Sequence, residues 1–170
     1  MTIAELNRLP QPAFAAELGQ VFEHSPWVAQ RAFPSHPFPS VDRLHDSMMA
    51  AVRSASLEER LTLIRAHPEL AGAEAVAGEL TPDSRSEQGR LGLTSLPRHE
   101  FNRLGELNRR YREKFGFPCV IALRLHASRE TVLKDMEQRL QNDREGELEN
   151  ALTQIGYVTR GRLAKIFGEG

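Results

Sequence analysis

Apolar residues in this chain recur mostly three or four positions apart, and this spacing restricts its fold more than any other feature. A helix turns once in ~3.6 residues, so the spacing lines apolar side chains along one helix face, whereas a half-buried strand needs strict alternation. The pattern predicts an all-α protein, a bundle of about eight or nine helices. Prolines and capping residues separate successive apolar stripes, which lie at residues 14–22, 27–33, 41–52, 57–64, 101–115, 132–140 and 148–166.

Local signals mark where several helices begin and end. Ser56 and Glu59 form a capping box, a start signal in which each side chain bonds to the backbone of the other residue. The helix that follows should end near His67, because a residue before proline is pushed out of the helical conformation. Thr81-Pro82 resembles another start. Residues 70–78 are small and Ala-rich, and they fit a short helix or an ordered loop equally well.

Residues 117–123 differ from the rest of the chain, because they form a continuous apolar run with a proline near its start. Such a run fits a buried strand or a buried extended segment. No second strand-like run exists to pair with it, so we expect an extended segment buried among helices. Its backbone groups need partners, and a planar ligand rich in amide-like groups could supply them, although a plain core segment is the commoner case.

The size and charge of the chain limit its partners. Its 170 residues fit a single domain over 1–170, because domains usually hold about 100 to 200 residues. The 22 Lys and Arg residues nearly balance the 23 Asp and Glu residues, for a formal net charge of -1. We therefore expect no nucleic-acid partner, since binding a run of phosphates requires positive charge.

The sequence also argues against membrane, metal and disulfide chemistry. No stretch approaches the ~18 apolar residues of a spanning helix, and the first residues lack the pattern of a secretory leader. We expect a cytoplasmic protein with no membrane contact. The single cysteine, Cys119, cannot form an internal disulfide. The six histidines lack the three or four residue spacing that pairs ligands on a helix, so no metal site is expected.

His67 is the first candidate for chemistry. It stands where a helix gives way to the rigid turn His67-Pro68-Glu69-Leu70, which would hold the imidazole in place. An imidazole titrates near pH ~6.5 and can both accept and donate a proton around neutrality. The alternative is a histidine that caps the end of the helix and interacts with its dipole.

Ser84, Glu87 and Gln88 form the second candidate group. Their spacing places a hydroxyl, a carboxylate and an amide on one helix face, where they could grip a small polar ligand. In the alternative, Ser84 and Glu87 form a capping box. A helix start at Thr81 would instead place Ser84 inside the first turn, so both interpretations stay open. An inward-pointing Arg160 or Arg162 could pair with a carboxylate, although most helical arginines are solvated.

Several blocks of sequence, taken in order, form a distinctive set. They are His67-Pro68-Glu69-Leu70, Ser84-x-x-Glu87-Gln88 with Gly92-Leu93, Asn108-x-x-Tyr111-x-x-Lys114-Phe115-Gly116-Phe117-Pro118, and Val120-Ile121. Together these blocks resemble the OHCU decarboxylases. The likeness runs from about Ser25-Pro26-Trp27 to Arg162-Leu163.

The resemblance implies an all-α, cofactor-free and commonly dimeric enzyme. Its expected activity is decarboxylation of 2-oxo-4-hydroxy-4-carboxy-5-ureidoimidazoline to (S)-allantoin in urate catabolism, the activity of a carboxy-lyase on a small molecule. It implies that His67 is the catalytic acid/base and that Glu87 is its partner carboxylate. The residues expected to bind substrate are Pro68, Ser84, Arg85, Ser86, Glu87, Gln88, Cys119, Val120, Ile121, Ala122, Leu123 and Arg162.

Two other functions remain alternatives at this point. In the first, the chain is a non-enzymatic helical module for ligand binding or interaction, the polar residues are helix caps, and the apolar run is core. In the second, the chain hydrolyses a related ureide and releases ammonia or urea instead of carbon dioxide.

Overall fold

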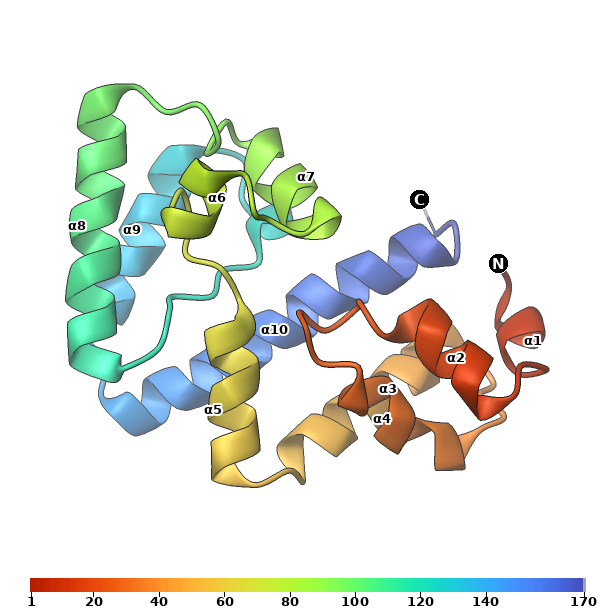
Figure 1. Ribbon diagram of the computed structural model, residues 1–170. Coiled ribbons are helices and arrows are strands. Elements are labelled where there is room, and N and C mark those ends of the chain that lie inside the picture. Colours follow the sequence, from red (N-terminus) through yellow and green to blue (C-terminus); the bar gives the residue numbers. More distant parts are fainter. Residues whose placement is uncertain (170) are drawn as a thin grey trace. The chain divides into compact units, whose positions relative to one another are not determined.

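The computed structural model describes residues 1–169, and within them it is all-α, as the spacing predicts (Figure 1). Ten α-helices occur there, against the eight or nine predicted: α1 is too short to form an apolar stripe, and α6 is the short helix that the sequence left open at residues 70–78. The α-helices are α1 (Ile3–Leu6), α2 (Gln11–Leu18), α3 (Trp27–Ala32), α4 (Val41–Arg53), α5 (Leu57–Ala66), α6 (Ala73–Ala77), α7 (Pro82–Arg90), α8 (Arg98–Phe115), α9 (Arg129–Arg139) and α10 (Arg144–Ile166). Two 3-10 turns, η1 (Phe33–Ser35) and η2 (Leu123–Leu125), complete the fold.

The chain forms two compact units. The N-terminal unit holds Met1–Ala66 together with the chain from Thr159 onward, and the central unit holds His67–Val158. Helix α10 contributes its residues up to Val158 to the central unit and the remainder to the N-terminal unit. Every predicted site residue except Arg162 belongs to the central unit.

In the N-terminal unit, α3 packs against both α2 and α4. Helix α4 begins after Ser40, whose hydroxyl accepts a hydrogen bond from the Arg43 amide at 3.2 Å. The capping box before α5 is confirmed, because the Glu59 amide donates to Ser56 Oγ at 3.1 Å and the Ser56 amide donates to Glu59 Oε1 at 3.2 Å. The buried face of α4 follows the predicted spacing, with Val41, Leu44, Met48 and Val52.

Helix α8 is the longest helix that lies wholly in the central unit, and Figure 1 shows it beside α9. Its apolar face is buried except for Phe101, which the sequence placed on the stripe but which is 40% exposed. Phe101 lies in the first turn of the helix. The helix ends at Gly116, whose φ of 79° is a conformation that glycine adopts without steric cost. The buried residues are Leu104, Leu107, Asn108, Tyr111 and Phe115.

The segment after α8 is extended and buried, as predicted. Residues 118–122 carry no regular secondary structure, and Leu123 already belongs to the turn η2. The side chains of Phe117 and of residues 119–123 are all at most 5% exposed. No strand pairs with this segment anywhere in residues 1–169. Within the same residues, none of the helices combines the length and the apolar character needed to cross a bilayer.

Candidate functional site

His67 is buried, with 6% of its surface exposed, and it opens a short loop at residues 67–72, which we call the His67 loop. Helix α5 ends at Ala66, one residue earlier, which confirms the predicted stop before Pro68. Ala71 has a φ of 50°, a left-handed conformation that costs a non-glycine residue ~1–2 kcal/mol. Contacts from the neighbouring helices must therefore hold the loop in this shape.

Helix α8 supplies some of these contacts. Asn108 Nδ2 donates to the Leu70 carbonyl at 2.9 Å, and Arg112 Nη1 bonds both carboxylate oxygens of Glu69 at 2.6 and 2.7 Å. Burial raises the pKa of Glu69 above its ordinary value, and the nearby Arg112 charge offsets part of that rise. Asn108 opens the Asn108-x-x-Tyr111-x-x-Lys114 motif, so one residue of that motif fixes the backbone beside His67.

Helix α7 supplies the other contacts through Gln88. The Ala71 amide donates to Gln88 Oε1 at 2.9 Å, and Gln88 Nε2 lies 3.4 Å from the Glu69 carbonyl. Gln88 is only 2% exposed, so these bonds form away from water. The structure therefore brings together two of the predicted blocks, the His67 loop and the polar face of α7.

The first turn of α7 settles which residue is its cap. Thr81 is the N-cap, and its hydroxyl accepts from the Ser84 amide at 3.3 Å, so Ser84 lies inside the helix. The capping-box interpretation of Ser84 and Glu87 is wrong, because Thr81 already fills the capping position. Ser84 is buried on the same side as Gln88, and Glu87 is half-buried. Arg85 and Ser86 are exposed, and Arg85 donates to the Gly78 carbonyl at 3.1 Å.

Side chains from three helices hold the backbone of residues 119–123. Arg139 of α9 donates to the Val120 carbonyl at 2.7 Å, the Ala122 amide donates to Gln154 of α10 at 2.9 Å, and Arg90 of α7 donates to the Leu123 carbonyl. Within residues 1–169, no hydrogen bond reaches the amides of Val120 and Ile121. Buried amides need partners, so this stretch can offer donors to a ligand. Burial raises the pKa of the Cys119 thiol to about 12, which keeps it neutral.

A buried polar network lies behind this segment, and the sequence analysis missed it. Glu147 is fully buried and pairs with Arg139, which is 5% exposed, at 3.0 Å. The Tyr111 hydroxyl also donates to Glu147, and Asn142 and Asn150 donate to it at 2.8 and 3.0 Å. Burial raises the pKa of Glu147, but these four donors, with Arg139 foremost, bring it below its ordinary value. A signal was present, because Tyr111 is the middle residue of the Asn108-x-x-Tyr111-x-x-Lys114 motif.

Arg162, the last predicted site residue, is buried in the N-terminal unit with 3% of its surface exposed. Its Nη1 lies 2.8 Å from Glu23 Oε2 and 3.2 Å from the Val21 carbonyl. The inward-pointing arginine paired with a carboxylate is thus confirmed, and Glu23 is the partner that the sequence analysis did not single out. Arg160 instead forms ion pairs with Asp42 and Glu169 at the surface.

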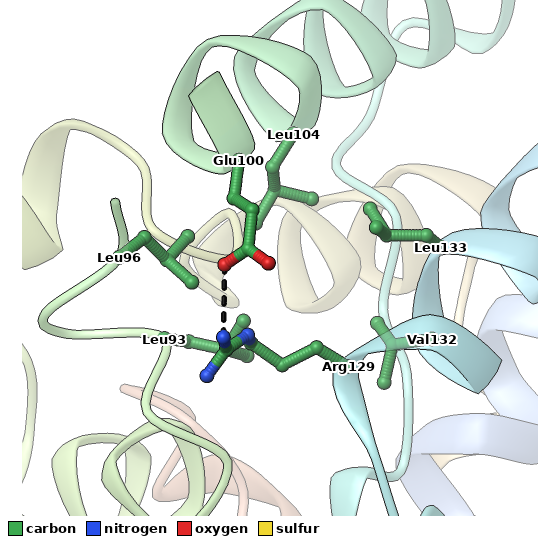
Figure 2. Close-up of a pocket in the computed structure, with 7 residues that line it drawn as sticks. All are labelled: Leu93, Leu96, Glu100, Leu104, Arg129, Val132 and Leu133. Atoms are coloured by element: carbon green, nitrogen blue, oxygen red, sulfur yellow. Dashed lines mark ion pairs between the residues drawn. The ribbon is translucent and has the colours of Figure 1, made fainter. Parts of the chain in front are cut away.

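A separate hollow in the central unit holds none of the predicted site residues. Figure 2 shows it between α8 and α9, with the Glu100–Arg129 ion pair of 2.9 Å at its centre. Its volume of about 10 Å³ is room for one water at most. Among residues 1–169, no three His, Cys, Asp or Glu side chains are grouped so that they could hold a metal ion.

Comparisons with known proteins agree on one family. A family model described as OHCU decarboxylase matches residues 7–164. A 2-oxo-4-hydroxy-4-carboxy-5-ureidoimidazoline decarboxylase of Haloferax volcanii is 39% identical over 167 residues, which cover 98% of this chain and 96% of that protein. A uric acid degradation bifunctional protein of Bacillus sp. (strain TB-90) is 39% identical over 170 residues, all of this chain but only 33% of that protein.

A solved structure has the same fold. The crystal structure of an (S)-allantoin synthase superposes with a TM-score of 0.78 at 29% sequence identity. The match covers 98% of this chain and 54% of that one.

Proposed function

Because this chain belongs to the OHCU decarboxylase family, we propose that it decarboxylates 2-oxo-4-hydroxy-4-carboxy-5-ureidoimidazoline to (S)-allantoin, as a carboxy-lyase of urate catabolism. The observation that carries the proposal is the pair of hydrogen bonds between buried Gln88 and the His67 loop. These bonds connect two sequence blocks about twenty positions apart, which supports a single polar site built from both blocks rather than two separate helix caps.

The substrate supplies its own electron sink, so the proposed reaction needs no cofactor. The bond between the ring carbon and the carboxyl group breaks, carbon dioxide leaves, and the electron pair moves into the conjugated ring C=N, whose nitrogen takes up a proton. The hydroxyl on the same carbon then gives up its proton and becomes a carbonyl, while the ureido-bearing carbon gains a proton. Spontaneous breakdown gives racemic allantoin, so the enzyme must add this last proton from one side.

The residues divide this work among them. His67, oriented by Glu87, moves the proton at the substrate hydroxyl or ring. Pro68, Ser84, Gln88 and the backbone of residues 119–123 hold the substrate, and the free amides of Val120 and Ile121 suit its carbonyl-rich ureido groups. Arg85 and Ser86 complete the proposed binding set of the central unit.

The direct test is to generate the substrate in situ from urate with the upstream enzymes and to follow the circular dichroism of the allantoin formed. The protein should yield (S)-allantoin faster than the spontaneous reaction. A racemic product at the spontaneous rate would support the non-enzymatic module, and release of ammonia or urea in place of carbon dioxide would support the hydrolase.

Two variants test the assigned roles. His67→Asn should lower the rate by about 10² to 10⁴, the usual contribution of a general acid/base, whereas His99→Asn, at an exposed histidine, is the matched control. Glu87→Gln should weaken catalysis more than folding. A His67→Asn enzyme with near wild-type turnover would remove His67 from the mechanism.

We also propose that the chain acts as one domain over 1–170, as a cytoplasmic homodimer. Light scattering on the purified chain should give twice the 19.1 kDa mass of one chain, and a monomeric mass at working concentration would reject the dimer.

A further inference from the structure

The backbone of residues 119–123 needs hydrogen-bond partners from the rest of the central unit. The segment is extended, buried and unpaired by any strand in residues 1–169, so no ladder of backbone hydrogen bonds fixes its position. Buried backbone groups without partners cost free energy. The backbone of such a segment keeps a fixed position only if side chains from other elements bond to it.

Arg139 and Gln154 hold it at adjacent points. Arg139 Nη1 donates to the Val120 carbonyl at 2.7 Å, and Gln154 Oε1 accepts from the Ala122 amide at 2.9 Å. The two contacts flank Ile121. Within residues 1–169, no hydrogen bond reaches the Ile121 amide, so it can donate to a ligand. Arg90 anchors the following turn by donating to the carbonyls of Leu123 and His126.

The guanidinium of Arg139 is itself fixed in orientation. Its Nε bonds Glu147 Oε2 at 3.0 Å, its Nη2 lies 3.0 Å from the same oxygen, and its Nη1 is directed to Val120. A planar guanidinium held by a carboxylate on its Nε–Nη2 edge has its third nitrogen, Nη1, fixed on the far side of the group. Glu147 therefore fixes the orientation of Arg139, and Arg139 in turn fixes the position of the Val120 carbonyl.

Stability alone does not explain this arrangement. A buried ion pair is often no more stabilising than well-packed apolar residues of the same size, because both charges lose their hydration. Apolar side chains of the same size could not orient a neighbouring polar group, whereas an ion pair can. The placement of the pair directly behind the segment favours this use.

We propose that Arg139 and Gln154 are positioning residues for the substrate cradle, and that they set substrate affinity by fixing the backbone at Val120 and Ala122. The inference rests on the proposed function. Neither side chain touches the substrate in this account, so both act on binding more than on the chemical step.

The test compares Arg139→Lys and Gln154→Met with Arg129→Lys as the matched control. Lysine keeps the charge facing Glu147 but cannot also reach Val120 with a second directed donor. Arg129 is an arginine of the same helix that also pairs with a glutamate, Glu100 (Figure 2). It donates to the carbonyl of Leu91, which lies outside residues 119–123. For folded variants, KM, kcat, the Kd for (S)-allantoin and the hydrogen exchange of the amides in residues 119–123 are measured.

Arg139→Lys should raise KM and the Kd for (S)-allantoin about tenfold, the usual effect of one hydrogen bond to a charged group, and change kcat less than about threefold. Gln154→Met should change the same quantities in the same direction by a smaller factor, because its bond is neutral. Both should speed exchange of the segment amides, and Arg129→Lys should change none of these values.

Normal KM, normal affinity and normal exchange in folded variants would overturn the inference. If Arg139→Lys fails to fold, Gln154→Met, at a half-buried position, tests the inference by the same measurements. A wild-type protein without catalysis would overturn the proposed function, whereas unchanged exchange in the variants would overturn the positioning role, so the two failures are distinguishable.

Discussion

Replacing Gln88 by methionine should destabilise the protein through the His67 loop. Methionine has nearly the same volume but can neither accept from the Ala71 amide nor donate to the Glu69 carbonyl. An unpaired buried amide costs about 1–3 kcal/mol. The second bond is long at 3.4 Å and adds less than that. The expected loss in the free energy of unfolding is therefore about 2 kcal/mol.

Guanidinium denaturation measures this loss, and the melting temperature should fall by about 4–8 °C for a chain of this size. Exchange of the Ala71 amide should also become faster, and decarboxylase activity should fall because His67 loses its support. Arg85→Met, on the exposed side of the same helix, should cost less than about 0.5 kcal/mol. A Gln88→Met protein within about 0.5 kcal/mol of wild type would refute the idea that Gln88 clamps the loop.

Three further predictions concern stability. Glu147→Gln should cost about 3–5 kcal/mol near neutral pH, because Arg139 is left buried without its counter-charge. The folded protein lowers the pKa of Glu147 below its ordinary value of 4.5, so the stabilisation by this carboxylate is present above pH 4.5 and is lost as the pH falls through the folded pKa. In urea unfolding, the difference in stability between Glu147→Gln and wild type should therefore shrink in acid. A difference that stays constant with pH would contradict this. Ala71→Gly should stabilise by up to about 1 kcal/mol in thermal unfolding by relieving the φ of 50°, and a clear loss would show that the alanine is unstrained. Gly92→Ala should cost about 1–2 kcal/mol, because φ is 71° and the added Cβ would lie 3.0 Å from Arg129 Nη1; an unchanged melting curve would reject it.

Much of the fold follows from local sequence. The stripes of α4 and α8, the capping box at Ser56 and the stop before Pro68 each depend on neighbours within one or two helical turns, and the structure confirms them. The single-turn helix α1 was missed because an apolar period needs more residues than it contains, and for the same reason the choice between a helix and a loop at residues 70–78, where α6 forms, stayed open. Phe101 fits the stripe in spacing but lies at the helix end, so periodicity alone could not tell that it is exposed.

The candidate site divides in the same way. Local spacing singled out His67 and the polar face of α7, but it could not choose between Thr81 and Ser84 as the cap, since both choices satisfy the same short-range pattern. The motifs contained Tyr111 and Arg162, but no local signal identified their distant partners, Glu147 and Glu23. Pairings across tens of residues depend on the tertiary fold, which spacing does not encode.

Arg139 and Gln154 bond the segment at 119–123 through its main chain, which is the same whichever amino acid carries it. Changes of side chain along this stretch that preserve bulk should therefore leave these bonds intact. The positions least tolerant of substitution lie outside the segment, at Arg139, Glu147 and Gln154 on α9 and α10.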